Sequence, residues 1–199
     1  MLSIIRSGLI SLLLTAMGCT SAVVTPMPPT VRRIAVLPPY SLGADAPIAD
    51  AETSLSFPIK MTVGDVLAEQ ARLRLAEKGL DVVDPISVKV ATKERIPTSP
   101  QMATKIMEEA QLDAAVLYIE VRRWEPAPYE RGMKADGVIV ALDVVMVDPK
   151  TGAILWRVHR PSRPVPLFGV VLTGQAHVFV AETVMREVFA LLGSKRSNA

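Results

Sequence analysis

The chain has few of the residues that catalysis, metal binding and disulfide bonding require. It contains one cysteine, Cys19, so it cannot form a disulfide within itself. Its two histidines, His159 and His177, have no Cys, Asp or Glu at a spacing typical of a metal site. Phosphate-loop, dinucleotide-binding, zinc-protease and serine-nucleophile motifs are all missing from the sequence. The sequence therefore predicts a protein that is not an enzyme and that uses no cofactor or metal.

A strong excess of one charge is also missing. The chain has 22 basic and 20 acidic residues, and removal of residues 1–18 would leave 21 against 20, a net charge of +1. This balance gives no electrostatic reason to expect nucleic acid as a partner. Hydrophobic residues make up 50% of the chain, enough to bury one domain core.

The first 18 residues have the pattern of a signal peptide. Arg6 supplies the positive charge, and the run from Gly8 to Gly18 carries no charge over 11 residues. A run of this length suits a signal-peptide core and is shorter than the roughly 20 residues needed to span a bilayer. Small residues then mark a cleavage site after Gly18.

Cys19 follows this site directly, and Ala16-Met17-Gly18-Cys19 resembles the lipobox of bacterial lipoproteins. The resemblance implies lipid on Cys19 and a membrane as a permanent partner. Thr20, where an Asp would retain the protein at the inner membrane, favours the periplasmic face of the outer membrane. The alternative is an ordinary secretory cut after Gly18. Residues 19–30 are predicted to form a Pro-rich tether, 31–193 a single domain and 194–199 a disordered tail.

The pattern of residues 31–193 predicts an α/β fold with a five-stranded mixed sheet and helices packed on it. Helical crossovers make the first three strands parallel, whereas the last three form an antiparallel meander. Thr62 and Asp65 suggest a capping box at the start of the first helix. The predicted strands are 33–37, 80–83, 114–121, 138–147 and 153–158, and the predicted helices are 62–78, 85–94, 100–110 and 174–192.

Four segments together carry a second resemblance. They are RRIAVLPP (32–39), AEKGLDVVDP (76–85), EEAQLDAAVLYIEVRRW (108–124) and VDPKTGAILWR (147–157). Their order and spacing are similar to those of envelope lipoproteins with a fold like the TolB amino-terminal domain, a group that includes the curli-secretion lipoprotein and an activator of penicillin-binding proteins. The resemblance covers about residues 31–192. It implies an accessory or scaffold role, and in some members an oligomeric export pore.

A few residues are candidates for a site. Asp143 interrupts a buried strand, so it either faces water or pairs with an arginine, or it lines a pocket. Arg157, Arg160 and Arg163 surround His159 and could bind anionic headgroups or a carboxylate-rich partner, or could be solvated strand-end charges.

The segment from Pro161 to Gly174 has three prolines followed by an apolar run. It either packs under the last helix or forms an exposed interaction loop through Leu167, Phe168 and Val171. Trp156 is expected to share a core-facing side of its strand with Ile154 and Val158.

The expected function is that of a periplasmic lipoprotein, anchored to the outer membrane, that acts as a non-enzymatic binding or assembly module. An envelope protein or a second copy of the chain would be its partner. The alternative is a subunit of an oligomeric secretion pore of the curli-secretion type.

Overall fold

The computed structural model describes residues 31–41, 62–126, 137–167, 173–190 and 192. The predicted signal peptide, Cys19, the tether and the tail lie outside these residues, as do Phe168 and Val171. No helix within the described ranges is long and apolar enough to cross a membrane.

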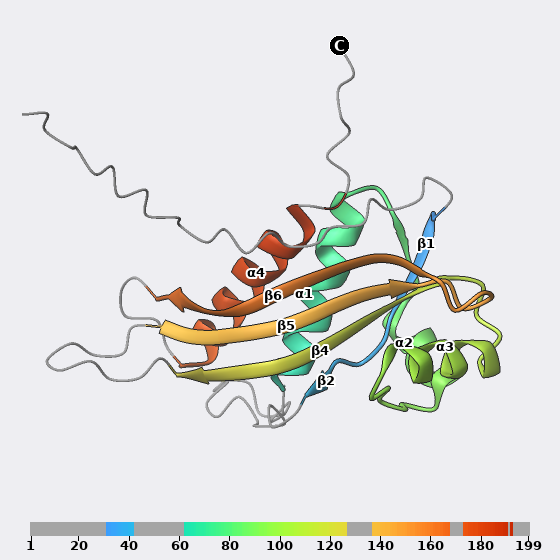
Figure 1. The fold of residues 1–199 in the computed structure, drawn as a ribbon, viewed down its shortest axis with the longest axis horizontal. Coiled ribbons are helices and arrows are strands. Elements are labelled where there is room, and N and C mark those ends of the chain that lie inside the picture. Colours follow the sequence, from blue (N-terminus) through green and yellow to red (C-terminus); the bar gives the residue numbers. More distant parts are fainter. Residues whose placement is uncertain (1–30, 42–61, 127–136, 168–172, 191, 193–199) are drawn as a thin grey trace, which may run out of the picture.

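The sheet has six strands, one more than the sequence predicts. They are β1 (Arg33–Val36), β2 (Tyr40–Ser41), β3 (Asp81–Val82), β4 (Ala115–Pro126), β5 (Gly137–Val147) and β6 (Ile154–Pro166). The strand order is β3-β1-β4-β5-β6, and the short β2 also pairs with β4 (Figure 1). As predicted, β1 runs parallel to β3 and β4, whereas β4, β5 and β6 form an antiparallel meander.

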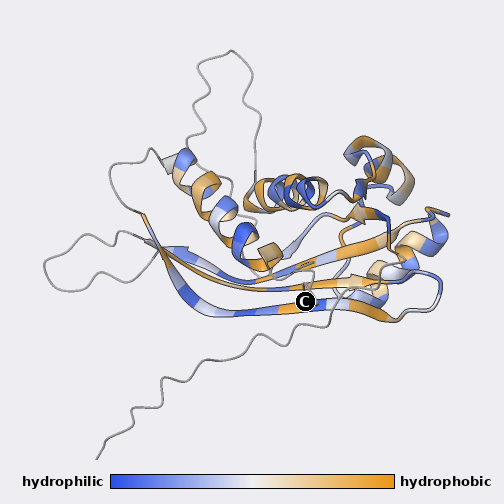
Figure 2. Cartoon of the chain, turned by 90° about the horizontal axis from the view of Figure 1, so that it is seen from above, coloured by the Kyte–Doolittle hydropathy of each residue, from blue (hydrophilic) through white to orange (hydrophobic). Residues whose placement is uncertain are grey.

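Four helices pack against this sheet. They are α1 (Val63–Glu77), α2 (Pro85–Thr92), α3 (Pro100–Glu109) and α4 (Thr173–Ala190). Figure 2 shows α1 and α4 on one side of the sheet, and Figure 1 shows α2 and α3 grouped at one end of it. We call the side covered by α1 and α4 the inner face, and the opposite side the outer face.

The start of α1 is fixed by the predicted capping box. The Thr62 side chain accepts a hydrogen bond from the Asp65 backbone N–H, and the Asp65 carboxylate accepts one from the Thr62 backbone N–H at 2.9 Å. Both bonds satisfy backbone donors that the first turn of a helix leaves without a partner. Gly79 follows the end of α1 with a positive φ of 78°, a conformation that glycine adopts without a steric penalty.

The two sides of the sheet have separate cores. On the inner face, alternate residues of β4, β5 and β6 pack against α1 and α4, with Leu142, Val144 and Trp156 among the fully buried side chains. On the outer face, a smaller core joins α2 and α3 to one end of the sheet and includes Val145 and Val147. Because both faces of β5 carry core residues, this strand reads as an almost continuous apolar run.

β4 and β6 are longer than the sequence pattern indicates, because irregularities interrupt their alternation. In β4 the register shifts between Val121 and Arg123, which leaves Arg122 as an extra residue. In β6 the predicted end at residue 158 is wrong, because the strand continues to Pro166. Three prolines fall in this extension, and a sheet tolerates them because β6 is an edge strand.

Trp156 lies in the inner core, as predicted. Its ring stacks on that of Phe189 in α4, with centroids 5.5 Å apart. The prediction that Ile154 shares this face is wrong, because a register shift between Met146 and Val147 moves Ile154 to the outer face, where half of it is exposed. Val158 does share the inner face with Trp156.

We predict that Trp156→Ala lowers the free energy of unfolding by roughly 3–5 kcal/mol, because it leaves a large cavity against Phe189. Urea denaturation measures this loss. Trp156→Phe is the matched control and should cost clearly less, since the ring contact is retained and the buried indole N–H has no acceptor among the described residues. Equal losses in the two variants would contradict the packing argument.

Candidate functional site

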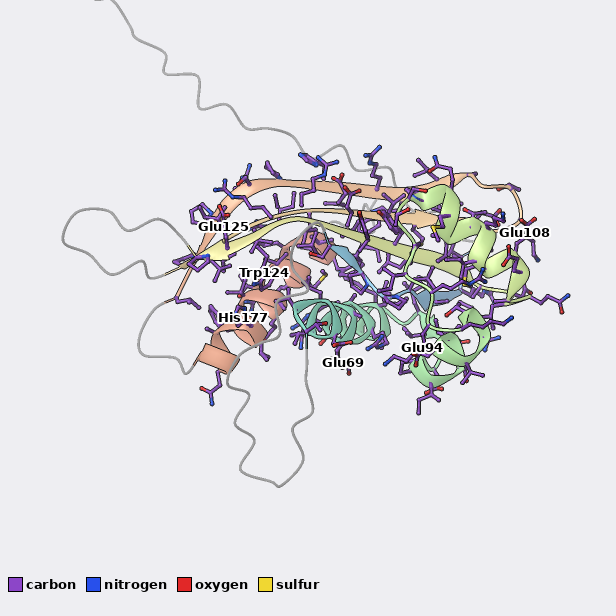
Figure 3. All side chains as sticks on the ribbon, turned by 90° about the horizontal axis from the view of Figure 1, so that it is seen from below. Glu69, Glu94, Glu108, Trp124, Glu125 and His177 are labelled. Atoms are coloured by element: carbon purple, nitrogen blue, oxygen red, sulfur yellow. The ribbon has the colours of Figure 1, made fainter. Side chains whose placement is uncertain are left out.

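None of the described helices lies over part of the outer face. α3 covers the end of β5 that holds Val145 and Val147, and the same side of β5 continues beyond α3 through Asp143, Ala141 and Ile139. In Figure 3 side chains project from this stretch of β4, β5 and β6 away from α1 and α4. Polar and charged side chains gather around Asp143 in this open stretch, and we describe them from this centre outward.

The centre is Asp143, whose side chain is 1% exposed although it is charged. Its direct cross-strand neighbours are Glu120 on β4 and His159 on β6. Asp143 pairs with the Arg122 guanidinium, and its Oδ1 lies 2.6 Å from His159 Nδ1. Arg157 Nη2 is 3.9 Å from Asp143 Oδ2, at the limit of an ion pair. Of the two alternatives for Asp143, the structure therefore places it in contact with arginine, beneath the side chains that cover it.

The covering side chains are about half exposed. Arg122, Arg157 and His159 have 44%, 52% and 49% of their side chains exposed. Their charged or polar ends lie over Asp143 while their stems cover the sheet, which explains how a carboxylate can be buried on a face that has no helix above it. Two guanidinium groups and one imidazole thus share a single carboxylate.

Glu120 completes this cluster on the side of β4. It lies 3.8 Å from Arg122, and its Oε2 accepts a long hydrogen bond of 3.5 Å from the hydroxyl of Tyr118. Burial raises the pKa of Tyr118 above its ordinary value, so the phenol stays protonated at neutral pH. Tyr118 is therefore a hydrogen-bond donor on the border between the outer core and the polar cluster.

The three arginines singled out in the sequence do not form one cluster. Arg157 pairs in register with Val145 of the outer core, whereas Arg160 and Arg163 pair with Leu142 and Val140 of the inner core. Arg160 is buried, and it donates hydrogen bonds to Glu187 in α4 and to a backbone carbonyl of β5. Its role in the structure is to join α4 to β6, and Arg157 alone of the three lies beside Asp143.

A pocket adjoins Arg157 on the outer face. Val145 and Val147 of β5 form its apolar part, together with Ile154, and Arg157 lines it from the same strand as Ile154. The first turns of α3 supply the opposite wall through Pro100, Gln101 and Thr104. An apolar hollow and a half-exposed guanidinium therefore lie next to each other.

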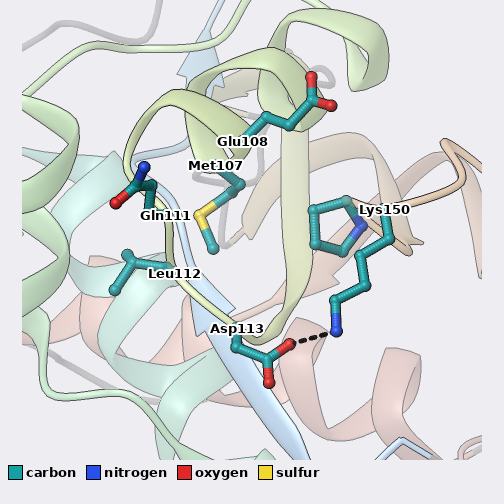
Figure 4. Close-up of a pocket in the computed structure, with 7 residues that line it drawn as sticks. Met107, Glu108, Gln111, Leu112, Asp113 and Lys150 are labelled. Carbon is teal, nitrogen blue, oxygen red and sulfur yellow. Dashed lines mark ion pairs between the residues drawn. The ribbon is translucent and has the colours of Figure 1, made fainter.

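A second pocket lies between the end of α3 and the turn that joins β5 to β6. Met107, Gln111 and Leu112 line one side of it, and Lys150 reaches Asp113 at 2.8 Å (Figure 4). The Lys150 ammonium holds the pKa of the Asp113 carboxyl below its usual range. Both side chains are well exposed, so this pair is a surface ion pair with little effect on stability.

The two histidines lie in different places. His159 belongs to the polar cluster, whereas His177, in the first part of α4, contacts Trp124 at the end of β4 (Figure 3). The indole N–H of Trp124 donates to His177 Nδ1 at 3.0 Å, and the two rings stack with centroids 6.1 Å apart. Burial lowers the pKa of His177, which favours the neutral imidazole that accepts this bond. Within the described residues, no three side chains of His, Cys, Asp or Glu are grouped as metal ligands.

Of the three residues proposed for the interaction loop, only Leu167 is described, and it packs partly buried against the inner core. Val165 just before it is buried in that core. On α4, which follows the loop, Val178 and Phe179 are each 41% exposed.

Sequence reasoning missed Arg122, Glu120 and Tyr118. The available signal was the double arginine at residues 122–123, which follows an apolar strand. Simple alternation could not place Arg122 correctly, because the register of β4 shifts at this residue.

The fold and this site define a mixed α/β domain with one helix-covered sheet face and one half-open polar face. Comparison with solved structures gives a match to a PelC dodecamer from Paraburkholderia phytofirmans, with 17% identity over 88% of this chain and 99% of that chain, and a TM-score of 0.53. The chain therefore shares the fold of PelC.

Two other solved structures are similar at lower TM-scores. Lipoprotein GNA1162 from Neisseria meningitidis is 20% identical over 79% of this chain and 98% of that one, with a TM-score of 0.44. TolB from Acinetobacter baumannii is 13% identical over 86% of this chain and 32% of that one, with a TM-score of 0.33. Membership of a particular TolB-like group stays a prediction. No family model and no curated protein sequence matches the chain.

We predict that lowering the pH from 7.5 to 5.5 destabilises the protein in part through His177. Its pKa in the folded state lies below that of an unfolded histidine, about 6.5. This contribution to stability is complete above pH 6.5 and is lost as the pH falls below it, because protons then bind the unfolded chain preferentially.

His177→Gln keeps a side-chain acceptor for Trp124 and removes the titration. Urea midpoints measured at both pH values should differ less for this variant than for the wild type. The same pH response in both proteins would contradict the prediction, because it would show that folding does not shift the pKa of His177.

Proposed function

We propose that this chain is a periplasmic lipoprotein, held at the outer membrane through Cys19, that acts as a non-enzymatic binding or assembly module of an envelope complex. The observation that carries the binding role is the open outer face of β4, β5 and β6. Three half-exposed side chains are grouped there around one buried carboxylate, and two of them, Arg122 and His159, contact it directly. Side chains that are already ordered lose little entropy on binding, which suits a surface for recognising a protein.

The anchor rests on the sequence. The lipobox-like residues end at Cys19, and 12 residues later Val31 leads into β1. A fully extended segment of that length spans roughly 40 Å. The domain would therefore work close to the membrane, within reach of other proteins anchored there.

We predict that Cys19→Ala converts a membrane-bound protein into a soluble or uncleaved one, because no thiol remains to carry the lipid. Phase separation in a cloud-point detergent measures the change. The wild type should enter the detergent phase, and a Cys19→Ala protein should not. Ser21→Ala, next to the same site, is the matched control and should partition like the wild type. Recovery of the wild type in the aqueous phase would refute the anchor.

A second candidate function is that of a subunit in an oligomeric secretion pore. The observation that favours it is the fold shared with PelC, which was solved as a dodecamer. Phe168 and Val171 would provide the contact between copies, together with the exposed Val178 and Phe179 of α4.

The two candidates differ in oligomer size and in the effect of the loop. If the chain forms a ring, sedimentation in detergent should give a large, single species, and Phe168→Ser with Val171→Ser should dissociate it without lowering the melting temperature. Leu167→Ser is the folding control, since Leu167 packs on the core and its loss should lower the melting temperature. A monomer or dimer in the wild type would exclude the pore and leave the binding module.

A further inference from the structure

We propose that the outer face at β5 and β6 binds a segment of a partner protein in which an apolar side chain lies beside a carboxylate. The apolar side chain occupies the pocket lined by Val145, Val147 and Ile154, and the carboxylate binds Arg157, beside His159. This inference rests on the proposed function as a binding module and names the chemistry of its partner.

The cationic half of the site arises because the arginines are exposed and the carboxylate that they surround is buried. Arg122 and Arg157 converge on the same oxygen of Asp143, while His159 takes the other oxygen. Asp143 is buried beneath them, so an approaching ligand meets the two guanidinium groups and the imidazole before it meets the carboxylate. A face with balanced formal charge thus presents donors to a ligand.

Arg157 is the residue in this cluster with donors to spare. Its separation of 3.9 Å from Asp143 is too long for a good hydrogen bond, and half of its side chain is exposed. Arg122 pairs closely with Asp143 and also approaches Glu120. A planar guanidinium held over a sheet binds a carboxylate with two parallel hydrogen bonds, which favours Arg157 as the main contact.

His159 lies two residues further along the same strand and on the same face. Alternate residues of a strand are about 6.5–7 Å apart, so the His159 ring borders the position of the carboxylate. Because the Asp143 carboxylate accepts from Nδ1–H of His159, Nε2 of the neutral ring is an acceptor, and the donors for the ligand carboxylate come from Arg157.

The apolar half of the site adjoins the cationic half through Arg157, which lines the pocket. The floor is apolar, since Val145 and Val147 are almost fully buried, and Ile154 is half exposed at its side. Among the described strand residues, Ile154 is the one large hydrophobic side chain that is exposed. An apolar group seated here would cover it.

The observations favour a protein segment over a lipid surface. Membrane binding by a protein face requires several exposed apolar side chains together with the positive charge. The strands of the outer face expose one such side chain, in a pocket of limited extent beside the Arg157 guanidinium. That arrangement suits one apolar residue and one acidic residue close together in a polypeptide.

The experiment measures fluorescence anisotropy with the full mature chain in detergent micelles. The probes are three labelled eight-residue peptides of the same length, one with leucine–glutamate repeats, one with leucine–glutamine repeats and one with serine–glutamate repeats. The leucine–glutamate peptide should bind at least about tenfold more tightly than the other two, because each of them lacks one half of the required chemistry.

Substitutions in the chain should give the matching pattern. Arg157→Gln should weaken binding of the leucine–glutamate peptide about tenfold or more, as expected for a lost charge-assisted bond, and Ile154→Ser should weaken it by losing apolar contact. The controls are Arg186→Gln, an exposed arginine on α4, and Ile86→Ser, an exposed isoleucine on α2. Both controls should bind like the wild type, and thermal melting should confirm that all four variants are folded.

Several results would overturn the inference. Equal binding of all three peptides would do so, as would full binding by Arg157→Gln. A third is binding to vesicles of phosphatidylglycerol that Arg157→Gln abolishes while no peptide binds, which would identify a lipid site instead.

The proposed function is tested separately by crosslinking the anchored protein in intact membranes. A crosslinked partner retained unchanged by Arg157→Gln would leave the binding module standing and overturn this inference alone. A chain that crosslinks to nothing in membranes would overturn the proposed function.

Discussion

The structure depends on the burial of β5, because this strand is covered on both of its faces. On the inner face, α1 and α4 provide the cover along the whole length of the strand. On the outer face, α2 and α3 reach one end of the sheet and leave the rest without a helix. Side chains of β4 and β6 cover that remainder, and Asp143 at its centre is the anion that holds them there.

This arrangement explains why a carboxylate is retained in a buried strand. A lone buried carboxylate would be costly, and its removal would leave two arginines and a histidine close together with Glu120, 3.8 Å from Arg122, as the remaining carboxylate of the cluster. Held by Asp143, the same three groups form an ordered polar surface. The residues that complete the burial of the sheet are therefore also the residues available to a partner, which connects the stability of the meander with the proposed binding role.

The edge of the sheet is adapted in a related way. Among the described strands, β6 is the last on its side of the sheet, so one of its edges is unpaired. An edge of this length could pair with other chains. Three prolines and a register shift occur in its second half, where they remove backbone donors and bend the strand. The first half carries Arg157 and His159 on one side and Trp156 on the other. The second half of β6 is thus poorly suited to pair with another strand, while the side chains of the first half remain accessible to a partner.

The sequence by itself determined the class of the fold. Capping residues, turn residues and apolar periodicity are local signals, so they located α1, the β5–β6 turn and the parallel-then-antiparallel order of the strands. They also identified Asp143 as an anomaly and the segment after residue 160 as unusual. The prediction of a signal peptide and of lipid on Cys19 likewise rests on the sequence alone.

The tertiary structure decided what these residues contact. The shifts in register at Arg122 in β4 and between Arg160 and Arg163 in β6 change which side of the sheet the later residues face, and a periodic pattern cannot reveal them because one inserted residue reverses every later side chain. Arg157 and Arg160 lie on opposite faces by simple alternation, but the shift beyond Arg160 puts Arg163, three residues later, on the same side as Arg160. Arg122, the extra residue of the neighbouring β4, lies beside Asp143. The existence of the short β2 and the length of β6 also depend on tertiary structure. Each is defined by pairing with a neighbouring strand, and no local signal encodes the position of that strand.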